Sequence, residues 1–413
     1  MGKKLIYTSY SSNTRAKDLW ASIALLFTPW AWKNGGYAKK VQREFEKRFP
    51  ISKPYTFNYA RSGMYVLFKS LNLQQPTNEV VVQGFTCIAA VNPIIWANGK
   101  PIYADINVKT FNLDIESVKS KITKNTKAIM FQHTFGNSSG IDEIKQICKE
   151  NNLLLIEDCA NTIFGKHKNK LIGSFGDVAI FSFGRDKAIS SVNGGLILVN
   201  NQNLIPEFEK AYNTLTYPST IWIFKQLIYQ PIWSFIKATH NIKIGKLVHF
   251  ITIKTNILTK ATSLQEKKGE IINEIPCLLP NSLAKLAYIQ LKDIDLLNRH
   301  RLEINKIYEK ELDDVGSVKY ESGNVLLRYP ILLKDKNKAL NYFKSKYMQL
   351  FGDWYDKPIT PIEIDFQKIG YTRGSCTKSE KISNGIVNLP NHINISDGDA
   401  KSIVKTINDY YVG

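Results

Sequence analysis

Residues 177–195 read DVAIFSFGRDKAISSVNGG and contain the pattern from which the fold can be inferred. The apolar run Val178–Phe181 is typical of a buried β-strand. Ser182 follows that run, and Lys187 comes five residues after Ser182. A lysine just beyond a buried strand is either a solvated surface charge or a nucleophile in an apolar pocket. Other segments of the sequence indicate which of these two interpretations applies.

Strand-like and helix-like segments alternate on both sides of this stretch. Apolar strands are expected at residues 79–85, 100–106, 127–135, 153–159 and, after a bend at the two glycines, 194–200. Helices are expected at 37–49, 61–73 and 140–152. Strands that alternate with helices indicate parallel pairing. The fold class is therefore predicted as α/β, with a mostly parallel central sheet flanked by helices.

The C-terminal part has a different pattern, which predicts a smaller α+β domain. A long helix is expected at 279–312, a strand at 324–333, a helix at 336–348, and a closing strand, loop and helix at 385–411. The predicted boundaries are an N-terminal extension at 1–36, a large domain at 37–270 with an aromatic and basic insertion at 215–260, and a small domain at 271–413.

The composition excludes several classes of protein. The chain has 413 residues, is 44% hydrophobic and has five cysteines without CxxC spacing. This predicts a globular protein of a reducing compartment, with no disulfide framework and no metal site. The formal net charge of +19 fits nucleic acid, an anionic membrane or a phosphorylated ligand. Because the lysines are dispersed and no nucleic-acid-binding motif is present, no nucleic-acid partner is expected.

Two carboxylates end the predicted strand at 153–159, and the second of them is Asp158. Open α/β sheets bind ligands at the carboxyl ends of their strands, so Asp158 and Lys187 can face one ligand. A buried aspartate needs a cation, and a lysine in an apolar pocket is nucleophilic, which together suit a pyridoxal phosphate site. The alternative for Asp158 is a helix N-cap or the first acid of a loop. Phosphate donors are expected from Ser182 and from the turn at Ser62 and Gly63 that opens a helix.

Nine stretches carry a resemblance to a known family: GYAKKVQREFEKRF, RSGMYVLFKSL, GFTCIAAVNPIIWANGKPIYADINVKTFNLD, TKAIMFQHTFG, IEDCANTIFG, GSFGDVAIFSFGRDK, NGGLILVN, LAKLAYIQLKDID and VNLPNH. In this order they resemble the DegT/StrS-type sugar aminotransferases, which are fold type I enzymes that depend on pyridoxal phosphate. The matches cover roughly residues 33–200 and 275–413.

The resemblance implies roles for the candidate residues. Lys187 matches the lysine that forms a Schiff base with the cofactor, and Asp158 matches the partner of its pyridine nitrogen. Dehydratase relatives have histidine in place of that lysine, so Lys187 favours transamination. Ser182 matches the phosphate-binding serine, and Ser62 with Gly63 matches the helix start that holds the phosphate. Met64, next to them, is also expected to bind the cofactor.

Other positions match less closely. Asn161 stands where the family usually has Gln or His near the phenolic oxygen of the cofactor. His133 matches a histidine near the site, with a packed polar residue as the alternative. Cys87 falls at the position of the aromatic side chain that stacks on the cofactor ring, and Phe85 lies two residues away. The family's G-x-N-Y-R-M motif, which contacts the neighbouring subunit's phosphate, is replaced by IPCLLP at 275–280.

The resemblance implies an aminotransferase that converts a keto-sugar, linked to a nucleotide or a lipid, into an amino sugar for cell-surface glycan or lipid biosynthesis. The expected amino donor is glutamate, and the expected assembly is a homodimer. Two alternatives remain: a catalytically reduced pyridoxal-phosphate-binding protein, and a membrane-associated aminotransferase for a non-sugar lipid ketone.

Two aromatic segments, 19–32 and 215–260, contain five of the seven tryptophans, and 215–260 has lysines but no Asp or Glu. The first is shorter than the roughly 20 residues that span a bilayer, and no secretory signal is recognised. These segments either pack on each other or at the dimer interface, or bind an anionic membrane surface. The expected location is the cytoplasm, with peripheral attachment to the inner face of the cytoplasmic membrane.

Overall fold

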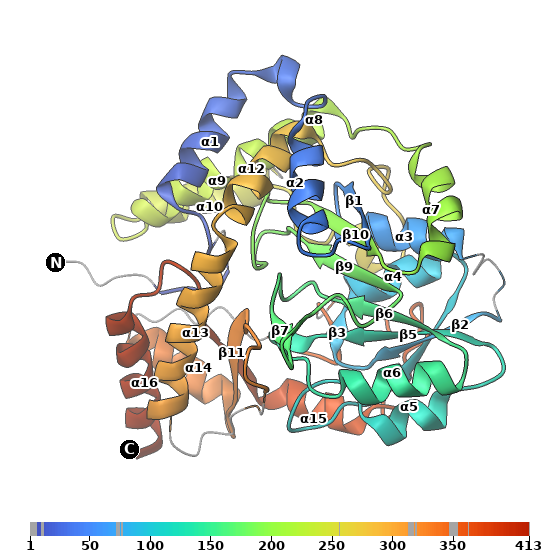
Figure 1. Cartoon of the computed structure of the whole chain (residues 1–413). Coiled ribbons are helices and arrows are strands. Elements are labelled where there is room, and N and C mark those ends of the chain that lie inside the picture. The colour runs from blue at the N-terminus through green and yellow to red at the C-terminus, as the bar shows by residue number, and fades with distance from the viewer. Residues whose placement is uncertain are drawn as a thin grey trace.

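The computed structural model describes residues 6–9, 12–71, 75, 77–255, 257–312, 318, 320–346, 354–361 and 363–412. Its centre is a seven-stranded sheet in the order β1-β10-β9-β6-β5-β2-β4 (Figure 1). The strands are β1 Lys53–Phe57, β2 Glu79–Gln83, β4 Lys100–Ala104, β5 Thr126–Gln132, β6 Leu154–Asp158, β9 Val178–Ser182 and β10 Gly195–Val199. β10 is antiparallel to β1 and β9, and the other neighbouring pairs are parallel. The predicted mostly parallel α/β sheet is confirmed.

Helices cover both faces of the sheet because side chains alternate along each strand. In β9, Val178 and Ile180 belong to one core cluster, whereas Ala179 and Phe181 belong to the cluster on the opposite face. The first face is covered by α3 Ala60–Ser70, α4 Ile88–Trp96 and α7 Ile205–Tyr212. The second is covered by α2 Tyr37–Glu46, α5 Ile115–Lys121, α6 Ile141–Glu150 and α12 Asn281–Leu291.

The C-terminal elements form a second core beside the sheet. They are α13 Ile294–Glu311, β11 Arg328–Leu332, α14 Lys336–Ser345, β13 Ile386–Pro390 and α16 Asp397–Val412. Between α14 and β13 the chain returns to the large domain, where β12 Ile359–Thr360 pairs with β3 Thr86–Cys87 in a separate two-stranded sheet and is followed by α15 Thr377–Gly385. The predicted α+β character of this region agrees with these elements, while the domain boundaries stay a prediction.

The prediction of one long helix at 279–312 is wrong in one respect, because the structure has two helices there, α12 and α13. Asp293 leaves helical geometry, with φ −106° and ψ 11°. Its carboxylate is instead an ion-pair partner of Arg15, at 2.6 Å, and of Lys17. These N-terminal cations lie at the start of α1 and hold the acid at the break.

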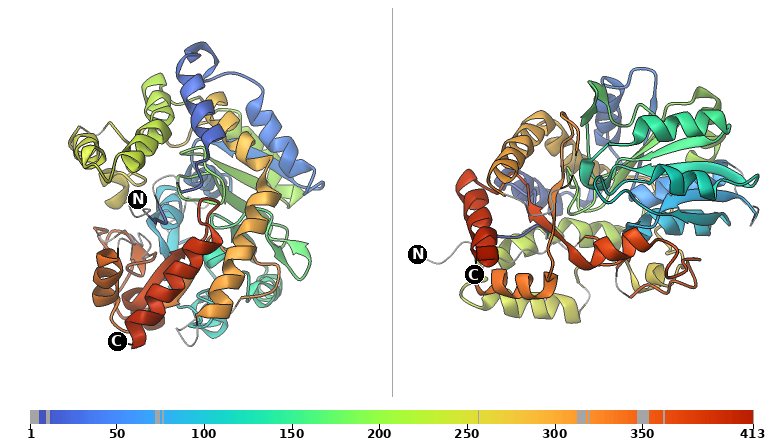
Figure 2. Two further views of the ribbon diagram at one scale, coloured as in Figure 1. Left: turned by 90° about the vertical axis from the view of Figure 1, so that its left-hand side faces the viewer. Right: turned by 90° about the horizontal axis from the view of Figure 1, so that it is seen from below.

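The N-terminal and insertion helices lie together at one end of the molecule. They are α1 Ala16–Leu26, α8 Thr220–Leu227, α9 Tyr229–Ala238 and α10 Ile244–Lys254. α1 packs against α8, α9 and α12, and α9 packs against α10. Figure 2 shows α1 and the yellow-green α9 and α10 along one edge of the molecule. In the described part of the chain, no helix has the length and apolar character needed to cross a bilayer.

Short elements complete the described chain: η1 Pro29–Ala31, η2 Thr134–Gly136, β7 Lys166–His167, β8 Lys170–Leu171, η3 Gln202–Leu204 and α11 Leu264–Lys267.

The glycines at the start of β10 serve close packing. Neither has the left-handed backbone that would require glycine. A Cβ on Gly195 would lie 2.4 Å from the backbone nitrogen of Ala60, and one on Gly194 would lie 2.6 Å from Ser191 Oγ. Glycine at 195 therefore lets the first residue of α3 pack directly against the start of β10. The sequence had instead suggested that the two glycines form a bend.

Candidate active site

A cavity of about 480 Å³ lies at the carboxyl ends of β5, β6 and β9, where Gln132, Asp158 and Ser182 contribute to its wall. Its volume is in the range of small-molecule and cofactor sites. Six of the sequence-predicted residues line it: Lys187, Asp158, Asn161, Ser182, Met64 and Cys87. The strand order explains this meeting, because β6 and β9 are parallel neighbours and their ends open at the same edge.

Lys187 is carried by the loop that joins β9 to β10, and its side chain lies inside this cavity. Its Nζ is 3.4 Å from Asn161 Oδ1 and 4.9 Å from the ring centroid of Trp354. Burial lowers the pKa of Lys187 below its usual value, and the charge of Arg328 adds to that, whereas Asp158 acts in the opposite direction. A lysine with a lowered pKa is more often uncharged and therefore more nucleophilic.

Residues that are distant in the sequence bind the backbone of the Lys187 loop. Asn13 Nδ2 donates a hydrogen bond to the carbonyl oxygen of Lys187. Arg301 of α13 donates through Nη2 to the carbonyl of Ala188, at 2.7 Å, and to Asn13 Oδ1, at 3.2 Å. Arg301 is fully buried, and this burial lowers its pKa to about 10. The N-terminal segment and the C-terminal core therefore both fix the position of Lys187.

Asp158 ends β6 with a buried carboxylate. Its Oδ1 accepts a hydrogen bond from the backbone nitrogen of Ala160, at 2.9 Å, and no other donor contacts this carboxylate among the described residues. Burial raises the pKa of Asp158, while the nearby Lys187 and His133 oppose that rise. A buried carboxylate with a spare oxygen at a cavity wall suits a cationic ligand atom, such as a protonated pyridine nitrogen.

The opposite part of the cavity has the features of an anion site. Ala60 and Arg61, in the first turn of α3, line the cavity, and no side chain caps this helix. Its free N–H groups and its dipole attract an anion. Ser182 is partly buried and its Oγ accepts a hydrogen bond from Gly184 N at 3.3 Å, which leaves the hydroxyl proton available. Together with Asp158 and Lys187, these groups fit the phosphate, ring nitrogen and aldehyde of pyridoxal phosphate.

Three predicted residues lie behind the cavity wall. The Ser62 hydroxyl donates to Asn58 Oδ1, at 2.8 Å. Gly63 packs against β10, where a Cβ would lie 2.4 Å from Ile197 Cγ1. Phe85 is fully buried and packs edge-on against Tyr355, with 5.1 Å between ring centroids. Cys87, and not Phe85, therefore borders the cavity.

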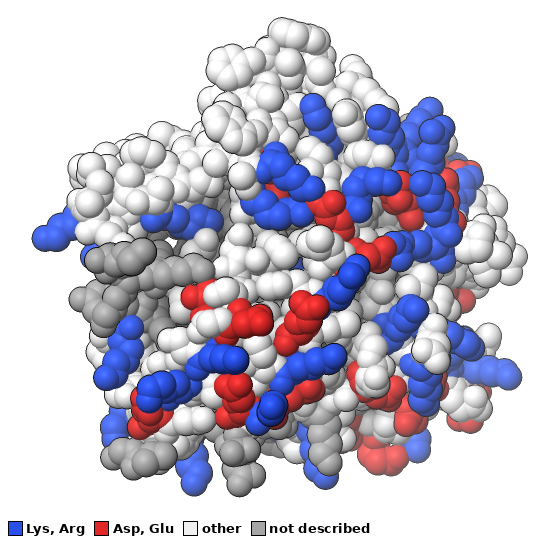
Figure 3. Space-filling model, turned by 60° about the vertical axis from the view of Figure 1, so that its left-hand side comes forward, with Lys and Arg blue, Asp and Glu red and all other residues white. Residues whose placement is uncertain are grey.

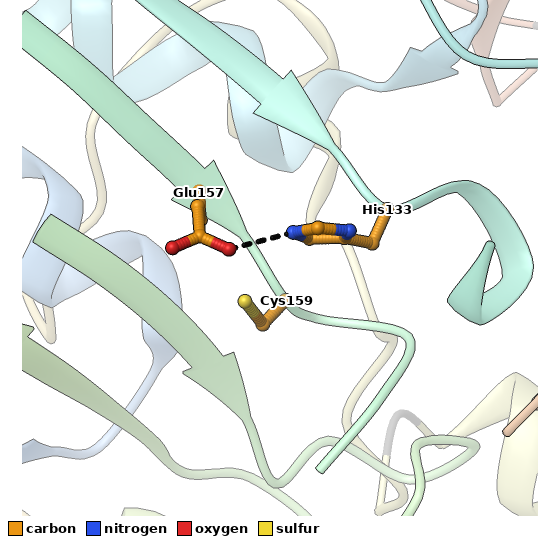
Figure 4. A group of neighbouring side chains, drawn as sticks. All are labelled: His133, Glu157 and Cys159. Carbon is orange, nitrogen blue, oxygen red and sulfur yellow. Dashed lines mark hydrogen bonds and ion pairs between the residues drawn. The ribbon is translucent and has the colours of Figure 1, made fainter. Parts of the chain in front are cut away.

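The fourth, His133, is fully buried beside Glu157 and Cys159, as Figure 4 shows, and does not line the cavity. Its Nε2 lies 2.9 Å from Glu157 Oε2. Glu157 also accepts hydrogen bonds from the backbone nitrogens of residues 173, 175 and 176, at 2.6 to 2.9 Å. These donors satisfy the carboxylate, and burial raises the pKa of the Cys159 thiol well above its usual value. These hydrogen bonds therefore hold the loop at 173–176 and the end of β5 against β6, outside the cavity.

Sequence reasoning missed the residues that close the cavity. Trp354 and Tyr355 supply aromatic side chains, and Arg185 is buried at its wall. Arg185 donates through both terminal nitrogens to Thr259, and its guanidinium lies 4.2 Å from the ring centroid of Tyr229. An aromatic pair within the polar stretch GDWYDKP was a signal that could have identified Trp354 and Tyr355. Arg185 lies between Ser182 and Lys187, but this position does not reveal its contacts with Thr259 and Tyr229, which are distant in the sequence.

Comparisons with known proteins place the chain in a family. A model of the DegT/DnrJ/EryC1/StrS aminotransferase family matches residues 16–255 and 275–408. GDP-perosamine synthase of Escherichia coli O157:H7 is 31% identical over 393 residues, which is 94% of this chain and 93% of that protein. A GDP-perosamine synthase of Vibrio cholerae is 34% identical over 184 residues, which is 45% of this chain and 50% of that protein.

Solved structures share the fold at low sequence identity. A putative sugar aminotransferase of Streptococcus pneumoniae, Spr1654, has a TM-score of 0.73 at 16% identity, over 96% of this chain and 97% of that one. Helicobacter pylori PseC has a TM-score of 0.73 at 18% identity, over 98% of this chain and 99% of that one. Residues 256–274 fall between the two blocks of the family match, although Lys260, Ala261, Thr262 and Lys267 line the cavity.

Proposed function

Since the chain belongs to the DegT/DnrJ/EryC1/StrS aminotransferase family, we propose that the cavity around Lys187 transfers the amino group of glutamate to the carbonyl carbon of a keto-sugar. The family match, together with a solved structure of Streptococcus pneumoniae Spr1654 in its PLP-form, supports pyridoxal phosphate as the cofactor. Glutamate becomes 2-oxoglutarate, and the keto-sugar becomes an amino sugar for cell-surface glycan or lipid biosynthesis. The sugar carrier is a nucleotide or a lipid.

The observation that carries this proposal is the pairing of Lys187 with Asp158 at one cavity. When bound, pyridoxal phosphate supplies an aldehyde that carries the amino group and a ring that accepts electrons. Lys187 would hold the cofactor at that aldehyde through its uncharged amine. The same amine would take the proton from the Cα of the donor and give a proton to the sugar carbon that receives the amino group. Asp158 holds the pyridine nitrogen protonated through its negative charge.

The other cavity residues orient the cofactor and exclude water from it. Ser182 and the first turn of α3 bind the phosphate, which fixes the distance between the ring and Lys187. Asn161 contacts the Lys187 amine directly, so the shorter Asn side chain serves where the family has Gln or His. Cys87, Trp354 and Tyr355 line the same cavity; Cys87 would border the cofactor ring, and the two aromatic side chains would exclude water from the reacting atoms.

A spectral half-reaction tests this function. Purified enzyme loaded with pyridoxal phosphate should lose its visible absorbance band when L-glutamate is added, with one 2-oxoglutarate formed per site. A matching keto-sugar from a panel of nucleotide-linked and lipid-linked compounds should restore the band. Lys187→Ala should show neither change.

An absence of any glutamate-dependent shift in the wild-type enzyme would support the alternative, a cofactor-binding protein with reduced catalysis. Restoration of the band by a non-sugar lipid ketone, but by no sugar, would assign the lipid-ketone alternative. D-glutamate is the matched control for the donor, because its Cα proton points away from a base that serves the L-isomer.

We also propose that the enzyme is a cytoplasmic homodimer attached peripherally to the inner face of the membrane. Support for a dimer comes from the resemblance to the family. Support for the membrane comes from the exposed aromatic side chains of the N-terminal and insertion helices. Light scattering of the purified protein tests the dimer, and a mass of one chain, 47.0 kDa, would contradict it.

A further inference from the structure

Large apolar side chains are exposed mainly at one end of the molecule. Eighteen described residues of this kind are exposed, and twelve of them fall within 20–30 and 221–257, which shows that the exposure is not scattered. Several are more than 60% exposed, among them Trp30, Phe27 and Ile221. The twelve are Trp20, Phe27, Trp30, Ile221, Phe224, Phe235, Ile242, Ile244, Leu247, Phe250, Ile251 and Ile257, and we call them the apolar face.

The helices that carry the apolar face are in contact with one another. α1 packs against α8 and α9, and α9 packs against α10. Figure 3 shows the surface at the top and upper left of this view without Asp or Glu, with Lys and Arg along its lower edge. Twelve side chains that each expose on the order of 100 Å² far exceed the apolar patch of roughly 300–600 Å² found on an ordinary monomer. An apolar surface of this size indicates a partner.

Three tryptophans of the same segments are structural, which separates them from the apolar face. Trp32, Trp222 and Trp233 are buried in the cores beneath it. The packing alternative raised by the sequence therefore accounts for these three, but leaves Trp20 and Trp30, at 67% and 79% exposure, without a role in the core.

The charge around the apolar face has one sign. Residues 211–265 contain six lysines and no Asp or Glu. Four of these lysines are exposed on or next to α10: Lys243, Lys246, Lys254 and Lys260. Apolar and aromatic side chains bordered by lysines are typical of helices that lie in the headgroup layer of an anionic bilayer.

We propose that the apolar face docks on an anionic lipid bilayer, with its aromatic side chains in the headgroup layer and the α10 lysines against acidic lipids. This names the residues and the lipid chemistry of the peripheral attachment proposed above. A second copy fits this face less well, because a two-fold interface brings identical surfaces together and would set these lysines against each other.

Docking in this orientation also brings the bilayer close to the cavity. The inner side of the same helices contacts the Lys187 loop, where Asn193 Nδ2 donates to Gln226 of α8 at 2.7 Å and Arg185 binds Thr259. The segment after α10 then continues into the cavity wall at Lys260. The active site therefore lies directly behind the docking helices.

Vesicle flotation with the full-length enzyme tests the proposal. The wild type should float with vesicles of phosphatidylcholine containing phosphatidylglycerol at low salt, and at least tenfold less with phosphatidylcholine alone or at high salt. Trp30→Ala with Phe250→Gln, and separately Lys243→Gln with Lys246→Gln and Lys254→Gln, should each reduce flotation at least tenfold.

Matched controls come from the rest of the surface. Ile51→Gln with Leu296→Gln replaces exposed apolar side chains outside the apolar face, and Lys124→Gln with Lys127→Gln and Lys149→Gln removes the same charge elsewhere. Both controls should float like the wild type.

Two outcomes would overturn the inference. The first is a wild type that does not float, or variants of the apolar face that float as well as their controls. The second is a Trp30→Ala with Phe250→Gln variant that loses its dimer on light scattering while flotation persists, which would assign the face to a second copy. The glutamate-dependent spectral shift is measured without lipid, so a failed flotation is distinguishable from a failed aminotransferase assignment.

Discussion

The side-chain nitrogen of Lys187 lies 3.4 Å from Oδ1 of Asn161, and both side chains belong to the wall of one cavity. Lys187 comes from the β9–β10 loop, whereas Asn161 comes from the loop that follows β6. The contact therefore exists because the sheet places the ends of β6 and β9 side by side. This contact is the first part of the site that can be tested by substitution.

Removal of the Asn161 amide should weaken the orientation of Lys187. We expect Asn161→Ala to lower kcat/KM by roughly tenfold, because the hydrogen bond that orients the Lys187 amine is lost and the lysine gains rotational freedom. Steady-state kinetics with glutamate provides the measurement. An Asn161→Ala enzyme with an unchanged kcat/KM would show that this contact does not orient the amine.

Asp158 should control both catalysis and the ionisation of Lys187. Its negative charge raises the pKa of Lys187 against the lowering effect of burial. Asp158→Asn removes that charge, so the pKa of Lys187 should fall further and more of the amine should be uncharged at a given pH. The rate at which apoenzyme acquires the visible absorbance band should therefore level off at a lower pH than in the wild type.

Transamination by Asp158→Asn should nevertheless fall by about 10²-fold or more, because the pyridine nitrogen loses its anionic partner. Asp186→Asn is the control, since Asp186 also raises the pKa of Lys187 but contributes less than Asp158. A pH profile for Asp158→Asn that moves to higher pH would contradict the assignment.

Cys87 reports whether the cofactor occupies this cavity. It is partly exposed, whereas the other four cysteines are buried. Burial in the cavity raises its pKa, so its thiol stays protonated at neutral pH and should react with iodoacetamide more slowly than glutathione. Peptide mass spectrometry should nevertheless find Cys87 labelled before the other four. Pyridoxal phosphate should slow this labelling further, and equal rates with and without it would place the cofactor elsewhere.

The buried guanidinium of Arg301 should stabilise the Lys187 loop. Its bonds to Ala188 O and Asn13 Oδ1 have no replacement when the side chain becomes apolar. Arg301→Met should lower the free energy of unfolding in urea by about 3 kcal/mol, since buried acceptors lose their donor. Arg299→Met is the matched control, because Arg299 is exposed on the same helix and its loss should cost less than about 0.5 kcal/mol. Equal costs for both variants would refute the role of Arg301.

The sequence was sufficient to predict the sheet and half of the site for a physical reason. Strand ends can be located from hydrophobic periodicity, and Asp158, Ser182 and Lys187 all lie at or just beyond such ends. The parallel pairing of β6 with β9 then brings them together. Asn161 and Cys87 came from the resemblance to the family, and both lie close to a strand end.

The other site residues could not be predicted, because their positions depend on contacts between segments that are far apart in the sequence. Arg301 lies 114 positions after Lys187, and its buried contact with the 188 carbonyl depends on how α13 packs against the sheet. Phe85 and Cys87 are two residues apart, and the direction of the chain after β2 decides that Cys87 reaches the cavity. His133 directly follows Gln132 of β5 and points to the other side, toward Glu157, because successive side chains of an extended segment alternate in direction. Gly63 lies on the side of α3 that packs against β10.

The covalent attachment point of the cofactor shows whether Lys187 is the lysine that binds it. Enzyme loaded with pyridoxal phosphate is reduced with sodium borohydride, digested and mapped by mass spectrometry. We expect one phosphopyridoxyl group per chain, on the peptide that contains Lys187, and none on this peptide in Lys187→Ala. A label on Lys260 or Lys267, the other lysines of the cavity wall, with Lys187 unmodified, would contradict the account.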